Sequence, residues 1–357
     1  MNDLRIPRVT VAIPTRNRAE LLKGCIQSVL DQTFADIEII VSDNASTDET
    51  ADVVASSEDP RIHYSPLEED IGLYGNLSRC LHLGRAPYLT IVPDDDYMLP
   101  RNLERKAEVL DRHPDVGIVH SSFHLLIDNP DGSQVLHEDV NQVGASSDMI
   151  ESGTVVARRL LSQPYFINFT GALIRRSVVR DDSFEAADGP AADLGLCLRI
   201  ARKASVAFLA ESLVGCRLHS DAGSVRDGIY EFTNGVYRPS LASVAITHLP
   251  KERFLARYGA EFDDQGKVRI ASRRYRREAL RYAIRLRSTP NRTGRDALAV
   301  LRAAVRVDRA VLMRPFAFRF LATSLLGVRG RRLLASLKRR VPKFRWRLKP
   351  GVNDRRA

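Results

Sequence analysis

The chain has 357 residues, enough for one large domain or two ordinary ones, and its 44% hydrophobic and 27% charged residues are typical of a globular protein. Its net charge of +10 is unevenly distributed: residues 251–357 hold 31 basic and 8 acidic residues (net +23), whereas residues 1–250 hold 23 basic and 36 acidic residues (net −13). We therefore expect two parts with different roles, one spanning residues 1–230 and the other residues 231–357.

The four cysteines are far apart in the sequence and include no C-x-x-C pair. This spacing argues against a disulfide framework or a zinc site and favours a reducing compartment. The chain shows no signal segment and no run of about 18 apolar residues that could span a membrane. These features predict a cytoplasmic location.

The acidic part alternates short apolar strands with helical patterns. A strand is expected at 9–13, followed by a polar turn and a helix whose apolar residues run from Leu21 to Leu30. Asn17 with Glu20, and later Ser46 with Glu49, have the spacing of capping boxes. The repeated β-α order predicts an α/β fold with a mostly parallel sheet covered by helices on both faces. Further strands are expected at 37–41, 62–64, 88–92, 116–120, 206–209 and 213–216, a strand or the approach to one at 166–174, further helices around 77–83, 99–110 and 193–201, and a polar surface excursion at 128–148.

Three carboxylates, Asp94, Asp95 and Asp96, follow the strand at 88–92 directly after Pro93. Carboxylates so close repel one another, and burying them without compensation is costly. A divalent cation such as Mg²⁺ or Mn²⁺ would compensate, and open α/β sheets bind ligands at the carboxyl ends of their strands. A single acidic triplet is more often a solvated turn, so the metal-site interpretation depends on the rest of the chain.

Two other strand ends carry suitable polar groups. Thr15 and Arg18 lie between the first strand and the start of its helix, where an anion can bind. Asp43 follows the second strand, where a carboxylate can accept hydrogen bonds from a nucleoside. The chain has no G-x-G-x-x-G motif, which disfavours a dinucleotide-dependent dehydrogenase.

Four segments together resemble the family 2 glycosyltransferases, which have the GT-A fold. They are residues 11–18, 40–50 and 88–100 and the pair Ala192-Asp193 with the apolar residues that follow; Arg217-Leu-His219 is a weaker fifth match. The resemblance covers about residues 8–225. The chain departs from the family where Pro93 and Ala192 replace common carboxylates and where a second asparagine near Ser78 is missing.

The resemblance implies transfer of a sugar, with inversion, from a nucleotide-diphosphate donor of the UDP or dTDP type to a hydroxyl of a glycan or lipid-linked acceptor, in bacterial cell-surface polysaccharide or glycolipid assembly. It implies that Asp193 is the catalytic base and that Mn²⁺ or Mg²⁺ is the cofactor, with Asp95 the best match to the family's metal ligand. The residues implied in metal binding are Asp94, Asp95, Asp96 and His219, and those implied in donor binding are Pro14, Thr15, Arg18, Asp43, Asn76 and Asp94.

The basic part, residues 231–357, has a mainly helical pattern. Its segment 311–328 is apolar but interrupted by Arg314, Pro315 and Arg319, which suits an interfacial helix better than a spanning one. Basic clusters at 329–332 and 338–349 favour anionic lipid. This predicts peripheral contact with the inner face of the cell membrane; the alternative is a helical appendage that packs on the catalytic domain.

Three other functions are weighed against glycosyl transfer. A nucleic-acid-binding role for the basic part is disfavoured, because residues 1–250 are acidic and no recognition motif is found, so we expect no nucleic-acid partner. A sugar-phosphate nucleotidyltransferase would need a glycine-rich phosphate loop after the first strand, which 14–18 lacks. A non-catalytic nucleotide-sugar-binding relative stays open.

Overall fold

The computed structural model describes residues 5–129, 131–162, 167–222, 225, 230–233, 236–239, 253–263, 266–271 and 273. The chain divides into two compact units, Met1–Arg281 and Tyr282–Ala357, and every described residue belongs to the first. The predicted interfacial segment and lipid-binding clusters lie outside the described residues. Within the described part, no helix is long and apolar enough to cross a bilayer.

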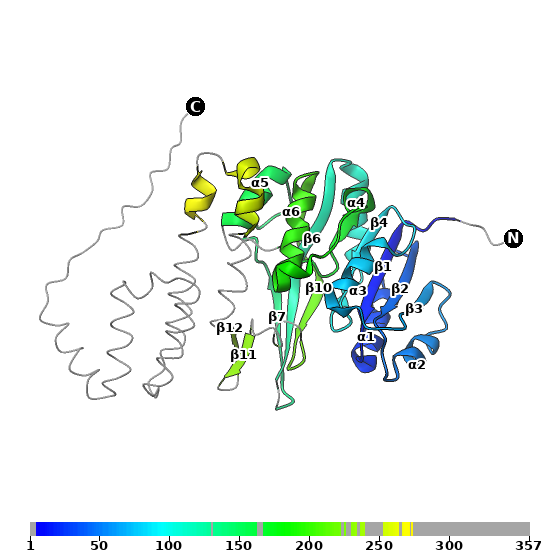
Figure 1. The fold of residues 1–357 in the computed structure, drawn as a ribbon. Helices are drawn as coiled ribbons and strands as arrows, with labels where there is room; N and C mark the ends of the chain where they lie inside the picture. Colours follow the sequence, from blue (N-terminus) through cyan, green and yellow to red (C-terminus); the bar gives the residue numbers. More distant parts are fainter. Residues whose placement is uncertain are drawn as a thin grey trace, which may run out of the picture. The chain divides into compact units, whose positions relative to one another are not determined.

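The first unit is built on one large mixed sheet (Figure 1). Its strands are β1 (Val9–Thr15), β2 (Ile37–Asp43), β3 (Ile62–Pro66), β4 (Tyr88–Ile91), β5 (Tyr97–Met98), β6 (Val116–Asp128), β7 (Gln134–Val140), β8 (Met149–Glu151), β9 (Leu173–Arg175) and β10 (Ser205–Leu218); β11 (Tyr230–Thr233) and β12 (Val236–Pro239) form a two-stranded sheet.

Along the main path the strand order is β3-β2-β1-β4-β9-β6-β10-β5. Strands β3, β2, β1, β4, β6 and β10 point the same way, because β9 pairs antiparallel with both β4 and β6. The shorter strands β5, β7 and β8 are antiparallel to their neighbours. The predicted α/β fold with a mostly parallel sheet is therefore confirmed.

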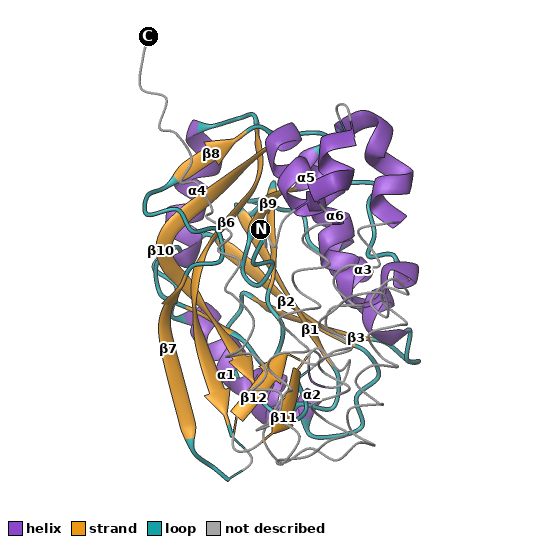
Figure 2. Cartoon of the chain, turned by 90° about the vertical axis from the view of Figure 1, so that its left-hand side faces the viewer, coloured by secondary structure: helices purple, strands orange, loops and turns teal. Residues whose placement is uncertain are grey.

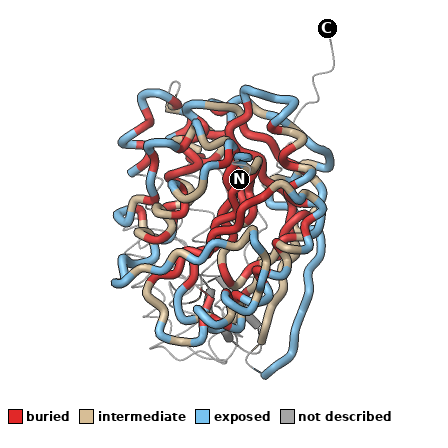
Figure 3. The backbone as a smooth tube through the Cα atoms, turned by 90° about the vertical axis from the view of Figure 1, so that its right-hand side faces the viewer, coloured by how far each residue is buried: buried red, intermediate tan, exposed pale blue. Residues whose placement is uncertain are grey.

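Helices cover both faces of the sheet (Figure 2), and the strands between them are buried (Figure 3). One apolar core joins the sheet to α1, α2 and α4, and the other joins it to α3, α5, α6 and the helical residues 253–262. All four cysteines are free. The helices are α1 (Ala19–Leu30), α2 (Thr50–Ala55), α3 (Gly72–His82), α4 (Asn102–Arg112), α5 (Gly153–Ser162) and α6 (Ala192–Ala201), with the short 3-10 helices η1 (Arg176–Val178) and η2 (Ala186–Ala191).

Several boundaries differ from the sequence prediction. The expected excursion at 128–148 contains β7, which pairs with β6. The two strands expected at 206–209 and 213–216 are one strand, β10, in which a bulge absorbs the polar interruption between Leu209 and Ser212. Helix α3 begins at Gly72, which has a positive φ of 75°, so Asn76 lies within the helix. Helix α5 was not predicted.

The predicted capping boxes are also wrong. Asn17 adopts a left-handed φ of 52°, and its side chain accepts a hydrogen bond from the Thr47 amide at 2.8 Å. The amide of Ala19, the first residue of α1, instead donates to Asp48 at 3.0 Å. The carboxyl ends of β1 and β2 lie side by side, so the turns that follow them satisfy each other's polar groups.

Candidate active site

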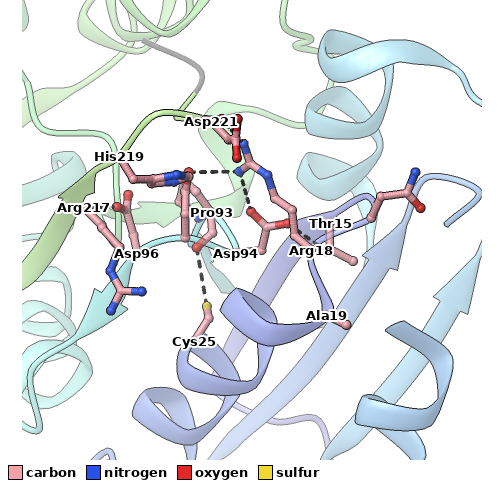
Figure 4. A network of polar contacts seen from close by, with 12 residues as sticks. Thr15, Arg18, Ala19, Cys25, Pro93, Asp94, Asp96, Arg217, His219 and Asp221 are labelled. Atoms are coloured by element: carbon pink, nitrogen blue, oxygen red, sulfur yellow. Dashed lines mark hydrogen bonds and ion pairs between the residues drawn. The ribbon is translucent and has the colours of Figure 1, made fainter. Parts of the chain in front are cut away.

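Arg18 joins the ends of three strands. Its Nη1 donates to Asp94 Oδ1 and to Asp95 Oδ2, both at 2.9 Å, and its Nη2 donates to the Asp221 carbonyl at 2.6 Å (Figure 4). Arg18 follows β1, the two carboxylates follow β4, and Asp221 follows β10. The acidic triplet is therefore a buried, compensated cluster and not a solvated turn.

The two carboxylates beside Arg18 have different surroundings. Asp94 is 4% exposed and accepts a hydrogen bond from Thr15 Oγ1 at 2.8 Å. Burial raises the pKa of Asp94 above its ordinary value, and the Arg18 charge only partly offsets this effect. Asp95 lies 3.2 Å from His219 Nε2. Burial would raise the pKa of Asp95 as well, but the His219 hydrogen bond and the Arg18 charge outweigh burial and lower it.

Asp96 has both carboxylate oxygens engaged by the protein. Oδ2 accepts from the Thr170 hydroxyl and Oδ1 from the Arg217 amide, both at 2.8 Å. Burial raises the pKa of Asp96 to about 8, with the neighbouring Asp95 adding to the shift. In this geometry Asp96 connects β10 to the turn before β9. Its implied role as a metal ligand stays a prediction.

A buried lysine holds the same turn from the other side. Lys106 in α4 is fully buried, and its Nζ donates to the Gly171 carbonyl at 2.8 Å. Burial lowers the pKa of Lys106 to about 7. In the sequence, Lys106 shares the helical spacing of the apolar residues around it, but no role is predicted for it. A lysine at an otherwise apolar helix position is the feature that could have indicated a buried hydrogen bond.

The residues expected to lie near the nucleoside, Asp43 and Asn76, are held by hydrogen bonds within the protein. Asp43 is 2% exposed and accepts from Ser46 Oγ and Tyr64 Oη, both at 2.5 Å. Ser46 therefore binds back to Asp43 and does not cap α2. Asn76 accepts from Ser42 Oγ at 2.6 Å and donates to the Ser42 carbonyl at 2.9 Å, so its amide joins α3 to β2.

Asp70 lies in the same region and was not predicted as a site residue. It forms an ion pair with Arg16 and accepts from Asn44 Nδ2 at 2.6 Å. Arg16 and Asn44 follow β1 and β2, so Asp70 connects the turns after both strands. The sequence gives little indication of this role beyond the position of Asp70 just before Gly72, where α3 begins.

Asp193 occupies the first turn of α6 and is half-buried. Its Oδ1 accepts from the Leu194 amide at 2.7 Å, and burial raises the pKa of Asp193 to about 6. Among the described residues, no hydrogen bond joins Asp193 to the acidic triplet. A carboxylate with such a pKa is ionised at neutral pH and can accept a proton.

Arg18 supplies the positive charge that compensates Asp94 and Asp95. Within the described ranges, no group of three or more His, Cys, Asp and Glu side chains is arranged to hold an ion. Asp95 and His219 offer two adjacent ligand atoms, and Mg²⁺ commonly uses one or two carboxylates together with substrate phosphates. The side chains thus fit a cation that shares its coordination with a bound diphosphate.

The mostly parallel sheet, the strand-end carboxylates and the helices on both faces agree with the GT-A fold that the sequence predicts. The sequence agrees: residues 10–182 match the model of glycosyl transferase family 2. This region of the chain, residues 10–182, is therefore a family 2 glycosyl transferase region.

Several relatives are similar to part of the chain. Over 98 residues the chain is 39% identical to the GalNAc(5)-diNAcBac-PP-undecaprenol beta-1,3-glucosyltransferase of Campylobacter jejuni, covering 26% of this chain and 31% of the relative. Over 106 residues it is 32% identical to the putative teichuronic acid biosynthesis glycosyltransferase TuaG of Bacillus subtilis, covering 29% and 42%. The matches thus span less than half of these relatives.

Solved structures show the same fold. TarS 1-349 of S. aureus in complex with UDP aligns over 95% of this chain and 93% of its own, with a TM-score of 0.56 and 14% identity. The complex of the same protein with UDP-GlcNAc also gives a TM-score of 0.56, at 15% identity. At these identities the likeness establishes the fold alone.

Replacing Arg18 tests the charge balance of the cluster. Arg18→Ala leaves Asp94 and Asp95 facing each other without a cation, so we expect the free energy of unfolding to fall by about 2 kcal/mol. Because Mn²⁺ can take the vacated position, it should raise the melting temperature of the variant more than that of the parent. Thermal unfolding with and without MnCl₂ measures this, with the exposed Arg5→Ala as control. Equal shifts in parent and variant would show that no cation binds there.

Proposed function

We propose that the protein is an inverting glycosyltransferase that moves a sugar from a nucleotide-diphosphate donor to a hydroxyl acceptor. The supporting observation is the meeting of Thr15, Arg18, Asp94, Asp95 and His219 at the carboxyl ends of β1, β4 and β10. Ligands of open α/β sheets bind at such strand ends. The family match and the relatives that carry glycosyltransferase names support the same reaction class.

The donor is proposed to lie across the ends of β1, β2 and β4. Asp43 faces the nucleoside, with Pro14 and Asn76 keeping β1 and α3 in place beside it. Thr15 and Arg18 lie nearer the diphosphate, and Arg18 can exchange its bond to Asp95 for one to a phosphate oxygen. UDP and dTDP donors fit this arrangement, and the UDP and UDP-GlcNAc complexes of the structural neighbour favour UDP.

Asp193 is proposed to remove the proton from the acceptor hydroxyl. The resulting oxygen attacks the anomeric carbon from the face opposite the nucleotide, so the configuration inverts and the nucleoside diphosphate leaves with the bond's electron pair. Asp95 and His219, with Asp94 beside them, would hold Mn²⁺ or Mg²⁺, which stabilises the charge on the leaving diphosphate. Arg18 stabilises the same charge through its guanidinium.

The first test is calorimetric titration of the full chain with UDP and with dTDP, with and without Mn²⁺. We expect binding in the micromolar range (Kd of about 1–100 μM) that depends on the metal and is lost in Asp95→Ala, because that variant removes the ionised carboxylate beside His219. The exposed Asp181→Ala serves as a matched control. Metal-independent binding would remove the metal from the proposal, and no binding of either nucleotide would favour a non-catalytic relative with the same fold.

The proposed base predicts a pH dependence. Burial raises the pKa of Asp193 to about 6, so the base is protonated and inactive below that pH and ionised above it. We expect kcat to rise about tenfold per pH unit below pH 6 and to level off above it. Asp193→Asn should lower kcat by about 10²–10⁴-fold while UDP binding is retained. The measurement is the rate of nucleotide release as a function of pH, with Asp181→Asn as control. An unchanged rate in Asp193→Asn would mean that another residue is the base.

We further propose that the acceptor is a glycan or lipid-linked glycan at the inner face of the membrane and that the basic region contacts that surface. The charge of +23 in residues 251–357 carries this proposal. Arg329, Arg331 and Arg332 changed together to Gln should weaken co-sedimentation with phosphatidylglycerol vesicles at low salt. The same charge removed at Lys23, Arg112 and Arg180 is the control. An equal loss of vesicle binding in both variants would mean that binding depends on the net charge of the protein and not on the cluster at 329–332.

A further inference from the structure

Residues 253–262 form a helix beyond the family-matched region that packs against the segment carrying Asp193. Four of its side chains, Phe254, Leu255, Tyr258 and Phe262, are 1–7% exposed and belong to the same apolar core as α5 and α6. Burial of this extent makes the helix an integral part of the first unit rather than a solvated appendage.

The helix of residues 253–262 approaches α6 at Gly195, about half a turn after Asp193. A Cβ built on Gly195 would lie 3.2 Å from Phe254 Cζ and 2.6 Å from Asp188 Oδ2. The absence of a side chain at Gly195 therefore lets the phenyl ring and the Asp188 carboxylate approach the first turn of α6. The ring of Phe254 supports the backbone that sets the position of Asp193.

Polar contacts reach the residues that lead into α6. Arg253 Nη1 donates to the Ala187 carbonyl at 2.6 Å, and Arg257 Nη1 donates to Glu185 Oε2 at 2.8 Å. Glu185 also forms an ion pair with Arg199 of α6 at 3.5 Å. The segment from Glu185 to Asp193 is thus held between α6 and the later helix.

We infer that the helix of residues 253–262 is a positioning element for Asp193: through Phe254, Arg253 and Arg257 it fixes the segment that presents the base to the acceptor hydroxyl. This inference rests on the proposed function for the role of Asp193. A base displaced by about 1 Å can lose up to about 10²-fold in rate.

Two variants of the full chain test the inference. Phe254→Leu shortens the side chain beneath Gly195, and Arg253→Ala combined with Arg257→Ala removes the surface contacts without altering the core. Arg202→Ala is the matched control, because it breaks an ion pair of the same helix, Arg202–Glu261 at 2.8 Å, at the opposite end of α6. If Phe254→Leu does not fold, the double variant decides alone.

The first readout is amide hydrogen exchange followed by mass spectrometry, which needs no substrate. We expect faster exchange in peptides covering residues 183–195 in both test variants, and no change there in the control. Unchanged exchange in these peptides overturns the inference, whether or not the protein binds a nucleotide, so this failure is distinct from failure of the proposed function.

The second readout is nucleotide release from UDP-GlcNAc or dTDP-glucose, whichever nucleotide binds in the calorimetric test. We expect kcat to fall about tenfold in Phe254→Leu and about threefold in the double variant, with donor KM unchanged. A kcat equal to that of Arg202→Ala, despite faster exchange, overturns the positioning role. Restored kcat in Arg257→Lys relative to Arg257→Ala supports it.

Discussion

The site depends on one charge interaction, between the Arg18 guanidinium and the carboxylates of Asp94 and Asp95. Two buried carboxylates in sequence repel each other, and neither could stay ionised in this position without a cation. Because Arg18 also binds the Asp221 carbonyl, the same group fixes the relative positions of β1, β4 and β10 at their carboxyl ends. In the proposed site, a donor diphosphate or a metal would have to replace one of these interactions.

The adjacent carboxylates Asp95 and Asp96 have different surroundings. Asp95 is held ionised by His219 and Arg18, whereas Asp96 points into the protein, where burial raises its pKa to about 8 and its oxygens accept bonds from Thr170 and Arg217. Lys106 holds the turn that contains Thr170 through the neighbouring Gly171 carbonyl. Neighbouring carboxylates of the acidic triplet thus differ in pKa and in hydrogen-bond partners, and their spacing in the sequence does not show this difference.

The first unit continues beyond the region matched by the family model, which ends at residue 182. Asp193 and the helix of residues 253–262 lie beyond it and pack together. The contacts of Phe254, Arg253 and Arg257 connect the proposed base to the start of the basic region.

The sequence alone determined the α/β class, most of the strands and helices and the polar strand ends, because apolar periodicity and turn chemistry are local properties. It missed α5 and β7, and it divided β10 into two strands. It could not determine that Asn17 and Ser46 would bind neighbouring turns instead of capping helices, that β10 would run through a bulge, or that Asp70 would join two turns. The family resemblance favoured Asp95 as a metal ligand, but the sequence could not show that Asp95 and Asp96 have different surroundings. These outcomes depend on which groups meet across the sheet, often from residues more than 70 positions apart, as for Arg18 and Asp94. Only the tertiary structure brings such groups within hydrogen-bonding distance and buries them to different extents.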